Sequence, residues 1–172
     1  PPRLPFSLSS LQVLAGKRFG YEPQQVLDTA QQLYEKKLTS YPRSDCEYLP
    51  KNQLSAAKTI LANLSGGAEP QLSAWAHGAD GTLRSRAWDD KKITAHHAIV
   101  PTTVRVDWDK LSLLERDIYF LIAQAYIAQF YPAYVYDQTK VGVTYSGEKF
   151  SASGRVVRAL GWKALYGGKD AE

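Results

Sequence analysis

The chain has 172 residues, of which 44% are hydrophobic and 22% are charged, so it is long and apolar enough to fold around one core. Its single cysteine, Cys46, excludes an internal disulfide framework and a zinc site of several thiolates, and it fits a reducing compartment. A net charge of +4 permits contact with phosphate groups without requiring it, and no apolar run approaches the roughly 20 residues of a membrane span.

Helical spacing dominates the chain up to residue 132. Ser9 with Gln12 forms a capping-box pattern, which predicts a first helix from about residue 10 to Gly20. Pro23 is favoured in the first turn of a helix, and the apolar stripe of the second helix fades at Lys36.

Three further helices follow in the sequence. Apolar spacing predicts a third helix over residues 54–64 and a short fourth helix over residues 71–76. Ser112 and Glu115 form a second capping box and open a long helix, which Pro132 ends.

After Pro132 the hydrophobic period changes from 3.6 to 2, which is the period of a strand. The run from Val135 to Tyr145, the turn signal Ser146–Gly147 and the residues around 149–152 predict two strands. We therefore expect an α+β fold that is mainly α, with a helical block followed by a β segment.

The segment Leu38–Cys46 contains the residues best suited to chemistry. Pro42 biases Tyr41 toward an extended backbone, and in an extended segment Tyr41 and Arg43 project to the same side. A phenol could then attack a phosphodiester while the guanidinium holds the phosphate and favours the phenolate. Asp45 would orient Arg43 or cap the next helix. On spacing alone a plain surface turn is the commoner alternative, because Pro, Ser and Asp all form turns.

Two adjacent histidines, His96 and His97, stand in a second extended run, where neighbours face opposite ways. One imidazole could reach a ligand while the other packs inward, bonded to the backbone. The only other histidine is His77 and zinc-site spacings are absent, which argues against a metal. A basic stretch with nearby tryptophans fits either a single nucleic-acid strand or a solvated loop. Its residues are Arg84, Arg86, Lys91 and Lys92, with Trp75 and Trp88 close by.

Four segments together resemble the type IA DNA topoisomerases, and the topoisomerase III branch in particular. They are Leu4–Gln12, the tyrosine motif Leu38–Pro50, the histidine motif Trp88–Lys92 with Ala95–Thr102, and Phe150–Gly154 with Gly161–Trp162. They follow the family's order and cover nearly the whole chain. The resemblance implies a strand of the gate-shaped β arch at 1–5, a helical active-site tyrosine domain at 6–132 and a β-arch segment at 133–172.

The resemblance also implies a reaction. Tyr41 would attack single-stranded DNA and form a 5′-phosphotyrosine bond; another strand would pass, and the break would be resealed without ATP. Arg43 is implied as the phosphate clamp and His96 as a partner of the scissile phosphate. His97 stands where other branches have an acidic residue, so the choice between the two imidazoles stays open. The expected DNA contacts are Ser9, Gln12, Arg84, Arg86, Lys91, Lys92 and His97.

The family's acidic, metal-binding Toprim domain has no counterpart in this chain. We therefore expect Mg²⁺ in the full-length enzyme and no cofactor here. The absence of methionine, the proline-rich start and the polar end predict a piece of a longer enzyme. Its partners would be single-stranded DNA and the remaining domains, without a membrane, and its setting the bacterial cytoplasm near the nucleoid. We expect this piece to be inactive alone.

Two other functions compete with this interpretation. One is a non-catalytic module that binds single-stranded DNA, and the weaker one is a tyrosine recombinase, which makes a 3′ linkage. A pure binder has no need of Tyr41 and Arg43 in one extended segment, which favours the topoisomerase.

Overall fold

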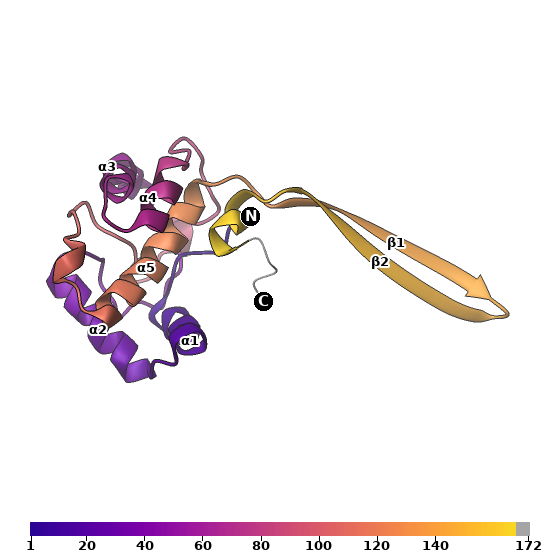
Figure 1. Cartoon of the computed structure of the whole chain (residues 1–172), viewed down its shortest axis with the longest axis horizontal. Helices are drawn as coiled ribbons and strands as arrows, with labels where there is room; N and C mark the ends of the chain where they lie inside the picture. Colours follow the sequence, from indigo (N-terminus) through magenta and orange to yellow (C-terminus); the bar gives the residue numbers. More distant parts are fainter. Residues whose placement is uncertain (168–172) are drawn as a thin grey trace.

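The computed structural model describes residues 1–167 and consists of a helical body from which one long β-hairpin projects (Figure 1). The α-helices in this range are α1 (Leu8–Phe19), α2 (Pro23–Glu35), α3 (Leu54–Ser65), α4 (Pro70–His77) and α5 (Leu113–Ile127). Short 3-10 turns lie at Lys51–Gln53, Asp90–Lys92, Trp108–Lys110, Ala128–Phe130 and Gly161–Tyr166. The fold is α+β and mainly α, as predicted.

Helix α5 forms the centre of the body (Figure 1). Its side chains are buried almost all round, including Ile118, Leu121, Ile122 and Tyr126. Helices α1, α2 and α4 pack against it. A helix that is buried on every side is held mainly by the hydrophobic effect, so α5 fixes the positions of the helices that carry the loops described below.

The first helix begins earlier than the sequence predicted. Its N-cap is Ser7, whose hydroxyl accepts the backbone N–H of Ser10, while the Ser10 hydroxyl accepts the backbone N–H of Ser7. The predicted capping box of Ser9 with Gln12 was therefore wrong. The Gln12 amide instead donates to the carbonyl of Pro23 at 2.9 Å and ties α1 to the start of α2.

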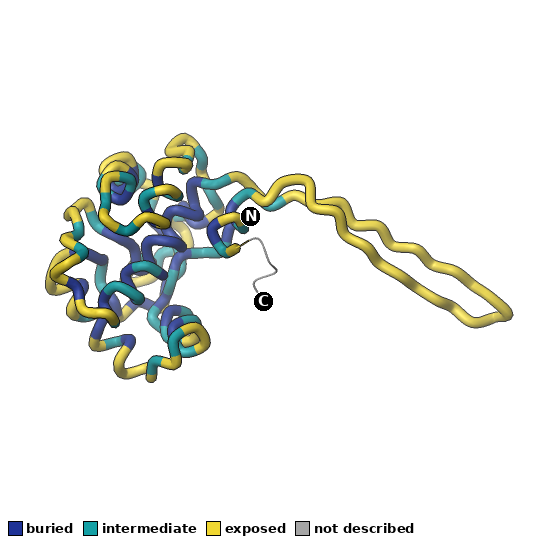
Figure 2. Tube along the Cα trace, viewed as in Figure 1, coloured by how far each residue is buried: buried dark blue, intermediate teal, exposed yellow. Residues whose placement is uncertain are grey.

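Strands β1 (Val135–Tyr145) and β2 (Glu148–Ala159) form the antiparallel hairpin. Ser146 and Gly147 both have positive φ angles, 50° and 85°, as a two-residue type I′ turn requires. Cross-strand pairs such as Val143 with Phe150 place apolar side chains on one face. Every residue of both strands is nevertheless exposed, and no part of residues 1–167 covers that face (Figure 2).

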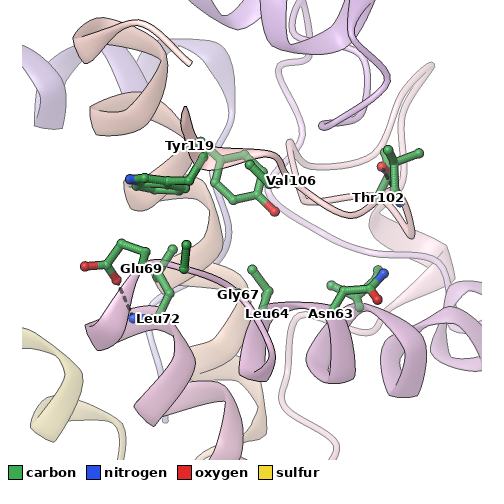
Figure 3. A pocket seen from close by; sticks show the side chains of 12 residues that line it. Asn63, Leu64, Gly67, Glu69, Leu72, Thr102, Val106 and Tyr119 are labelled. Carbon is green, nitrogen blue, oxygen red and sulfur yellow. Dashed lines mark hydrogen bonds between the residues drawn. The ribbon is translucent and has the colours of Figure 1, made fainter. Parts of the chain in front are cut away.

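A small apolar cavity lies between α3, α4 and the loop that precedes α5 (Figure 3). Its volume of about 20 Å³ is the size of a water molecule. Tyr119 contributes one wall, and burial raises the pKa of its phenol above the ordinary value. None of the predicted site residues lines this cavity, so the predicted site lies elsewhere in the molecule.

The C-terminus of α2 turns the chain toward the predicted tyrosine motif. Leu38 N–H donates to the carbonyl of Leu33 and Lys37 N–H to that of Tyr34, the two bonds of a Schellman motif. Lys37 occupies the left-handed position of this motif with a φ of 62°. Leu33 and Leu38 are both buried, so the helix end is anchored in the core.

Replacing Lys37 with glycine is expected to raise the free energy of unfolding by roughly 0.5–1 kcal/mol. The left-handed conformation strains a residue with a Cβ atom by roughly 1–2 kcal/mol, which exceeds the extra backbone entropy that glycine loses. Urea unfolding measures the change. The matched control is Lys58→Gly on the exposed face of α3. This control should lower the free energy of unfolding by about 1 kcal/mol. Equal losses in both variants would contradict the assignment.

A buried carboxylate links the ends of α2 and α5. Glu115 accepts the backbone N–H of Ser112 at 2.9 Å and lies 2.7 Å from the Lys36 ammonium. Burial raises the pKa of the Glu115 carboxyl, but the Lys36 charge and the Ser112 hydrogen bonds outweigh it and hold the pKa below its ordinary value. The ionised form is therefore the one that stabilises this corner of the body.

The Glu115→Gln variant should be less stable than the parent by roughly 1–2 kcal/mol at pH 7, since the amide keeps the cap and loses only the charge. A depressed folded-state pKa gives stability above the unfolded pKa of 4.5, and that stability is lost as pH falls through the folded value. Urea unfolding should therefore show the two proteins converging as pH drops below 4.5. The prediction is refuted if the unfolding free energies of the parent and Glu115→Gln differ by a constant amount from pH 7 to 3. It is also refuted if Glu115→Gln destabilises the protein no more than the exposed control Asp109→Asn.

Candidate active site

The tyrosine motif lies between two other segments of the chain, one from the N-terminus and one around the histidines. Isolated bridges join Phe6 to Ile99 and Thr39 to Pro101. The backbone hydrogen bonds that connect the three segments are Leu8 N–Ser44 O, Ser40 N–Val100 O, Ala98 N–Tyr48 O, Ile99 N–Phe6 O and Thr102 N–Leu38 O, all 2.8–3.0 Å long. Residues that are 36 or more positions apart in sequence are thereby fixed beside one another.

The Ser40 side chain strengthens this connection immediately before Tyr41. Its hydroxyl donates to the carbonyl of Ala98 at 3.1 Å and accepts the N–H of Val100 at 3.0 Å. The single hydroxyl of this short side chain thus forms hydrogen bonds with two backbone groups of the histidine segment. The backbone immediately before Tyr41 is consequently fixed to the histidine segment, although Tyr41 belongs to no helix or strand.

Burial alternates along the tyrosine motif. Pro42, Ser44 and Cys46 are buried, whereas Tyr41 is half-buried and Arg43 is exposed. The alternation resembles that of an extended segment, in which residues two apart face the same way, but the chain bends at Pro42 and Arg43. Tyr41 and Arg43 are thus both accessible to solvent, and the projection of their side chains to one side stays a prediction.

Two aromatic rings contact the ring of Tyr41. The His96 imidazole lies with its centroid 4.4 Å away at an interplanar angle of 38°. The Tyr34 ring lies 5.6 Å away in a T-shaped arrangement, with an interplanar angle of 82°. His96 is itself exposed, so an imidazole and a phenol lie side by side at the surface.

The two histidines have different surroundings. The His97 Nε2 atom lies 2.8 Å from the Gln53 side-chain nitrogen, and its Nδ1 atom lies 2.7 Å from the carbonyl of Ala98. Because the amide nitrogen donates and the carbonyl accepts, these contacts place the ring proton on Nδ1. His97 therefore anchors its loop, and His96 is the imidazole beside Tyr41.

Asp45 has neither of the roles expected for it. Its carboxylate accepts the Thr94 hydroxyl at 2.9 Å, and within residues 1–167 it forms no ion pair with Arg43 and caps no helix. The Thr94 hydroxyl also lies 3.5 Å from the carbonyl of His96. The hydrogen bond between Thr94 and Asp45 adds a side-chain connection between the tyrosine and histidine segments that the sequence did not reveal.

The basic stretch does not form one continuous row. The Arg84 guanidinium donates to the carbonyls of Gly81 and Leu83 within its own loop, and Arg86 is exposed. Lys91 and Lys92 lie in the turn Asp90–Lys92. The Lys92 ammonium lies 3.1 Å from the hydroxyl of Tyr48 and 4.6 Å from its ring centroid, which places that charge beside the tyrosine motif.

The neighbouring tryptophans belong to the interior. Trp88 is 6% exposed and packs against Tyr126 and Phe130, while Trp75 is half-buried against Phe120. Trp88 is thus a core residue and not a platform for a nucleic-acid base.

The remaining predicted contacts lie in α1. Ser9 is exposed in the first turn, with its hydroxyl 3.3 Å from that of Ser7. Gln12 is engaged with Pro23 as described. Both stay predictions as DNA contacts, as do the roles of the other site residues.

The described residues offer neither a metal-binding cluster nor a membrane-spanning helix. Within residues 1–167 no group of three or more His, Cys, Asp and Glu side chains is placed to hold a metal ion. In the same range, none of the helices has the length and apolarity needed to cross a bilayer.

Comparison with known proteins gives the chain its family. The DNA topoisomerase family matches residues 1–172. DNA topoisomerase 3 of Vibrio cholerae is 47% identical over 97% of this chain and 26% of its own length. DNA topoisomerase 3 of Salmonella typhimurium is 42% identical over 97% of the chain and 25% of its own length, and that of Bacillus subtilis is 35% identical over 94% and 22%.

The chain therefore spans about a quarter of the length of these relatives. The match runs through the tyrosine motif, the histidine motif and the hairpin alike. On this basis the chain belongs to the bacterial type IA DNA topoisomerases, on the branch of DNA topoisomerase 3.

Proposed function

We propose that this chain supplies the nucleophile with which a type IA topoisomerase breaks and reseals single-stranded DNA. The supporting observations are that Tyr41 is half-buried, that Arg43 two positions later is exposed, and that the His96 imidazole lies 4.4 Å from the Tyr41 ring at an interplanar angle of 38°. This combination offers an accessible attacking oxygen, an accessible cation two positions along the chain and a polar ring beside the phenol.

In the proposed reaction the phenol oxygen of Tyr41 attacks the phosphorus of a phosphodiester. A bond forms between the phenol oxygen and the phosphorus, which stays attached to the 5′ oxygen of one DNA piece. The bond from the phosphorus to the 3′ oxygen of the other piece breaks. The phenol proton is released, and the departing 3′ oxygen takes up a proton. One ester replaces another, so the reverse attack by the 3′-hydroxyl reseals the strand without ATP after another strand has passed.

Arg43 is proposed to hold the phosphate. Its guanidinium is exposed and, within residues 1–167, engages no carboxylate. A planar cation of this kind can bond two phosphate oxygens at once and stabilise the charge that develops on them. His96 is proposed to donate a hydrogen bond to the same phosphate. His97, bonded to Gln53, keeps the loop in place.

Residues 1–167 offer no fitting site for the magnesium ion expected for the whole enzyme. Mg²⁺ prefers several oxygen ligands, and residues 1–167 provide no cluster of three acidic or other ligating side chains. We therefore place the metal in the Toprim domain, outside this chain, and infer that the chain alone neither cleaves nor relaxes DNA. Its setting is proposed to be the bacterial cytoplasm, at the nucleoid.

The remaining domains of the same enzyme are proposed as partners of the hairpin. A two-stranded hairpin by itself is marginally stable, and the exposed side chains of Val141, Val143 and Phe150 form one uncovered face. Burying such a face against more of the β arch would stabilise both. This is the support for a β-arch segment beginning at residue 133; residues 168–172 of the predicted segment lie outside the described residues.

The alternative is a module that binds single-stranded DNA without cutting it. An experiment that separates the two uses an exchange chimera, in which this chain replaces the matched quarter of the Vibrio cholerae DNA topoisomerase 3. Labelled single-stranded DNA is incubated with the chimera and Mg²⁺, and the reaction is stopped with detergent. A catalytic chain leaves DNA attached to protein after denaturation. Binding that disappears completely in detergent, with the parent relative still trapping DNA, would support the alternative.

A further inference from the structure

Tyr34 is a second tyrosine at the site, and it belongs to a rigid element. It lies in the last turn of α2, next to the fully buried Leu33. Its carbonyl accepts the N–H of Lys37 at 2.8 Å, as part of the motif that ends the helix. Its ring is 40% exposed, so the side chain is not required to fill the core.

The exposed ring of Tyr34 meets the nucleophile. The left-handed turn at Lys37 reverses the chain, so that the Tyr41 ring lies 5.6 Å from the Tyr34 ring in a T-shaped arrangement at 82°. The His96 ring lies 4.4 Å from the same Tyr41 ring. The Tyr41 phenol is thus in contact with one ring from a helix and one from a loop.

These ring contacts are what orient the phenol. Within residues 1–167 the Tyr41 hydroxyl makes no hydrogen bond, and its backbone lies outside any helix or strand. Edge-to-face aromatic pairs have a preferred geometry, and a nucleophile that is already oriented loses less freedom on reaching the transition state.

We infer that Tyr34 is a positioning residue for the Tyr41 nucleophile, acting through its ring alone. The inference rests on the proposed function, because a positioned phenol matters only if that phenol attacks DNA. It assigns no chemistry to the Tyr34 hydroxyl. Phenylalanine at this position should therefore preserve the rate of covalent adduct formation, and alanine or leucine should lower it.

The contact can be tested in the chain itself by NMR of the imidazole protons. The chain has three histidines, and the His96 resonance is shifted by the ring current of Tyr41. In Tyr34→Ala we expect that resonance to move toward the value of a free histidine, while Tyr34→Phe leaves it in place. The control Tyr145→Ala removes a ring at the tip of the hairpin and should leave it unmoved. An unchanged His96 resonance in Tyr34→Ala overturns the inference.

The consequence is tested with the exchange chimera. Tyr34→Ala and Tyr34→Leu should slow formation of the covalent DNA adduct about three- to tenfold, with the Kd for single-stranded DNA unchanged and Tyr34→Phe within about twofold of the parent. Leucine keeps the bulk at the helix end, so a fall seen only in alanine, together with a lower Tm, would mean a structural role and contradict the inference.

The two proposals fail in different ways. If the chimera traps DNA through Tyr41 and Tyr34→Ala traps it equally fast, the positioning role is wrong and the proposed function stands. If the chimera never traps DNA, the proposed function fails and the positioning role fails with it, even where the NMR experiment shows that the ring contact exists.

Discussion

The Tyr41→Phe variant of the exchange chimera is expected to form no covalent DNA adduct, with a loss of at least about 10⁴-fold in the rate of cleavage. Phenylalanine keeps the ring that contacts Tyr34 and His96 and removes only the attacking oxygen. Stability and binding of single-stranded DNA should therefore stay close to those of the parent.

The control for this variant is Tyr145→Phe, which deletes a hydroxyl from a 74% exposed ring at the hairpin tip. It should cleave normally. Quantifying trapped DNA in denaturing gels measures both proteins side by side. Residual adduct above one part in a hundred with Tyr41→Phe would mean that another residue attacks the phosphate.

Replacing Arg43 with alanine should lower the rate of adduct formation about 10²–10³-fold, which corresponds to roughly 3–4 kcal/mol of transition-state stabilisation. The guanidinium is proposed to bond the phosphate as charge develops on its oxygens, so the loss should appear mainly in the rate. Binding should weaken far less, because one phosphate contact contributes little to the total. Single-turnover cleavage at saturating DNA separates the two.

Arg43→Lys is the informative companion, since it keeps the charge and loses the two-pronged geometry. It should recover only part of the rate. Arg155→Ala, which removes an exposed charge from the hairpin, controls for net charge and should cleave like the parent. A uniform loss of binding in Arg43→Ala, with the saturated rate unchanged, would contradict a phosphate clamp.

Local signals predicted most of the helices because helix ends are decided by nearby residues. The Ser112–Glu115 capping box, the first-turn proline Pro23 and the terminal Gly20 all act where the sequence placed them. The predicted start of the first helix was wrong because two overlapping capping patterns compete there. Ser7 with Ser10 forms the observed cap, and neighbouring sequence alone does not rank it above the later pair.

The site was predictable only in part, for a physical reason. Local sequence predicted that Tyr41 and Arg43 are accessible on either side of the buried Pro42, and this needs no information from elsewhere in the chain, whereas their projection to one side stays a prediction. The distinction between His96 and His97 depends on Gln53, 44 positions away, and on the ring of Tyr41. Contacts over such distances in sequence are created by the fold, so periodicity does not reveal them.

The surroundings of Trp88 and of the hairpin are likewise decided by residues distant in sequence. Trp88 was grouped with basic residues by proximity in sequence, whereas its neighbours in space are the α5 side chain Tyr126 and Phe130. The period of two along β1 and β2 correctly predicted strands, yet a period does not say what covers the apolar face. In residues 1–167 that face of the hairpin is open.

Mass spectrometry of the trapped complex tests the central claim most directly. The chimera is denatured on labelled single-stranded DNA, digested with protease and nuclease, and the modified peptide is sequenced, while end-labelled substrates report which DNA end is attached. We expect the phosphate on the Tyr41 oxygen, attached through the 5′ end of the broken strand, with a free 3′-hydroxyl on the other piece. Modification of any other residue, or attachment through a 3′ phosphate, would contradict the account.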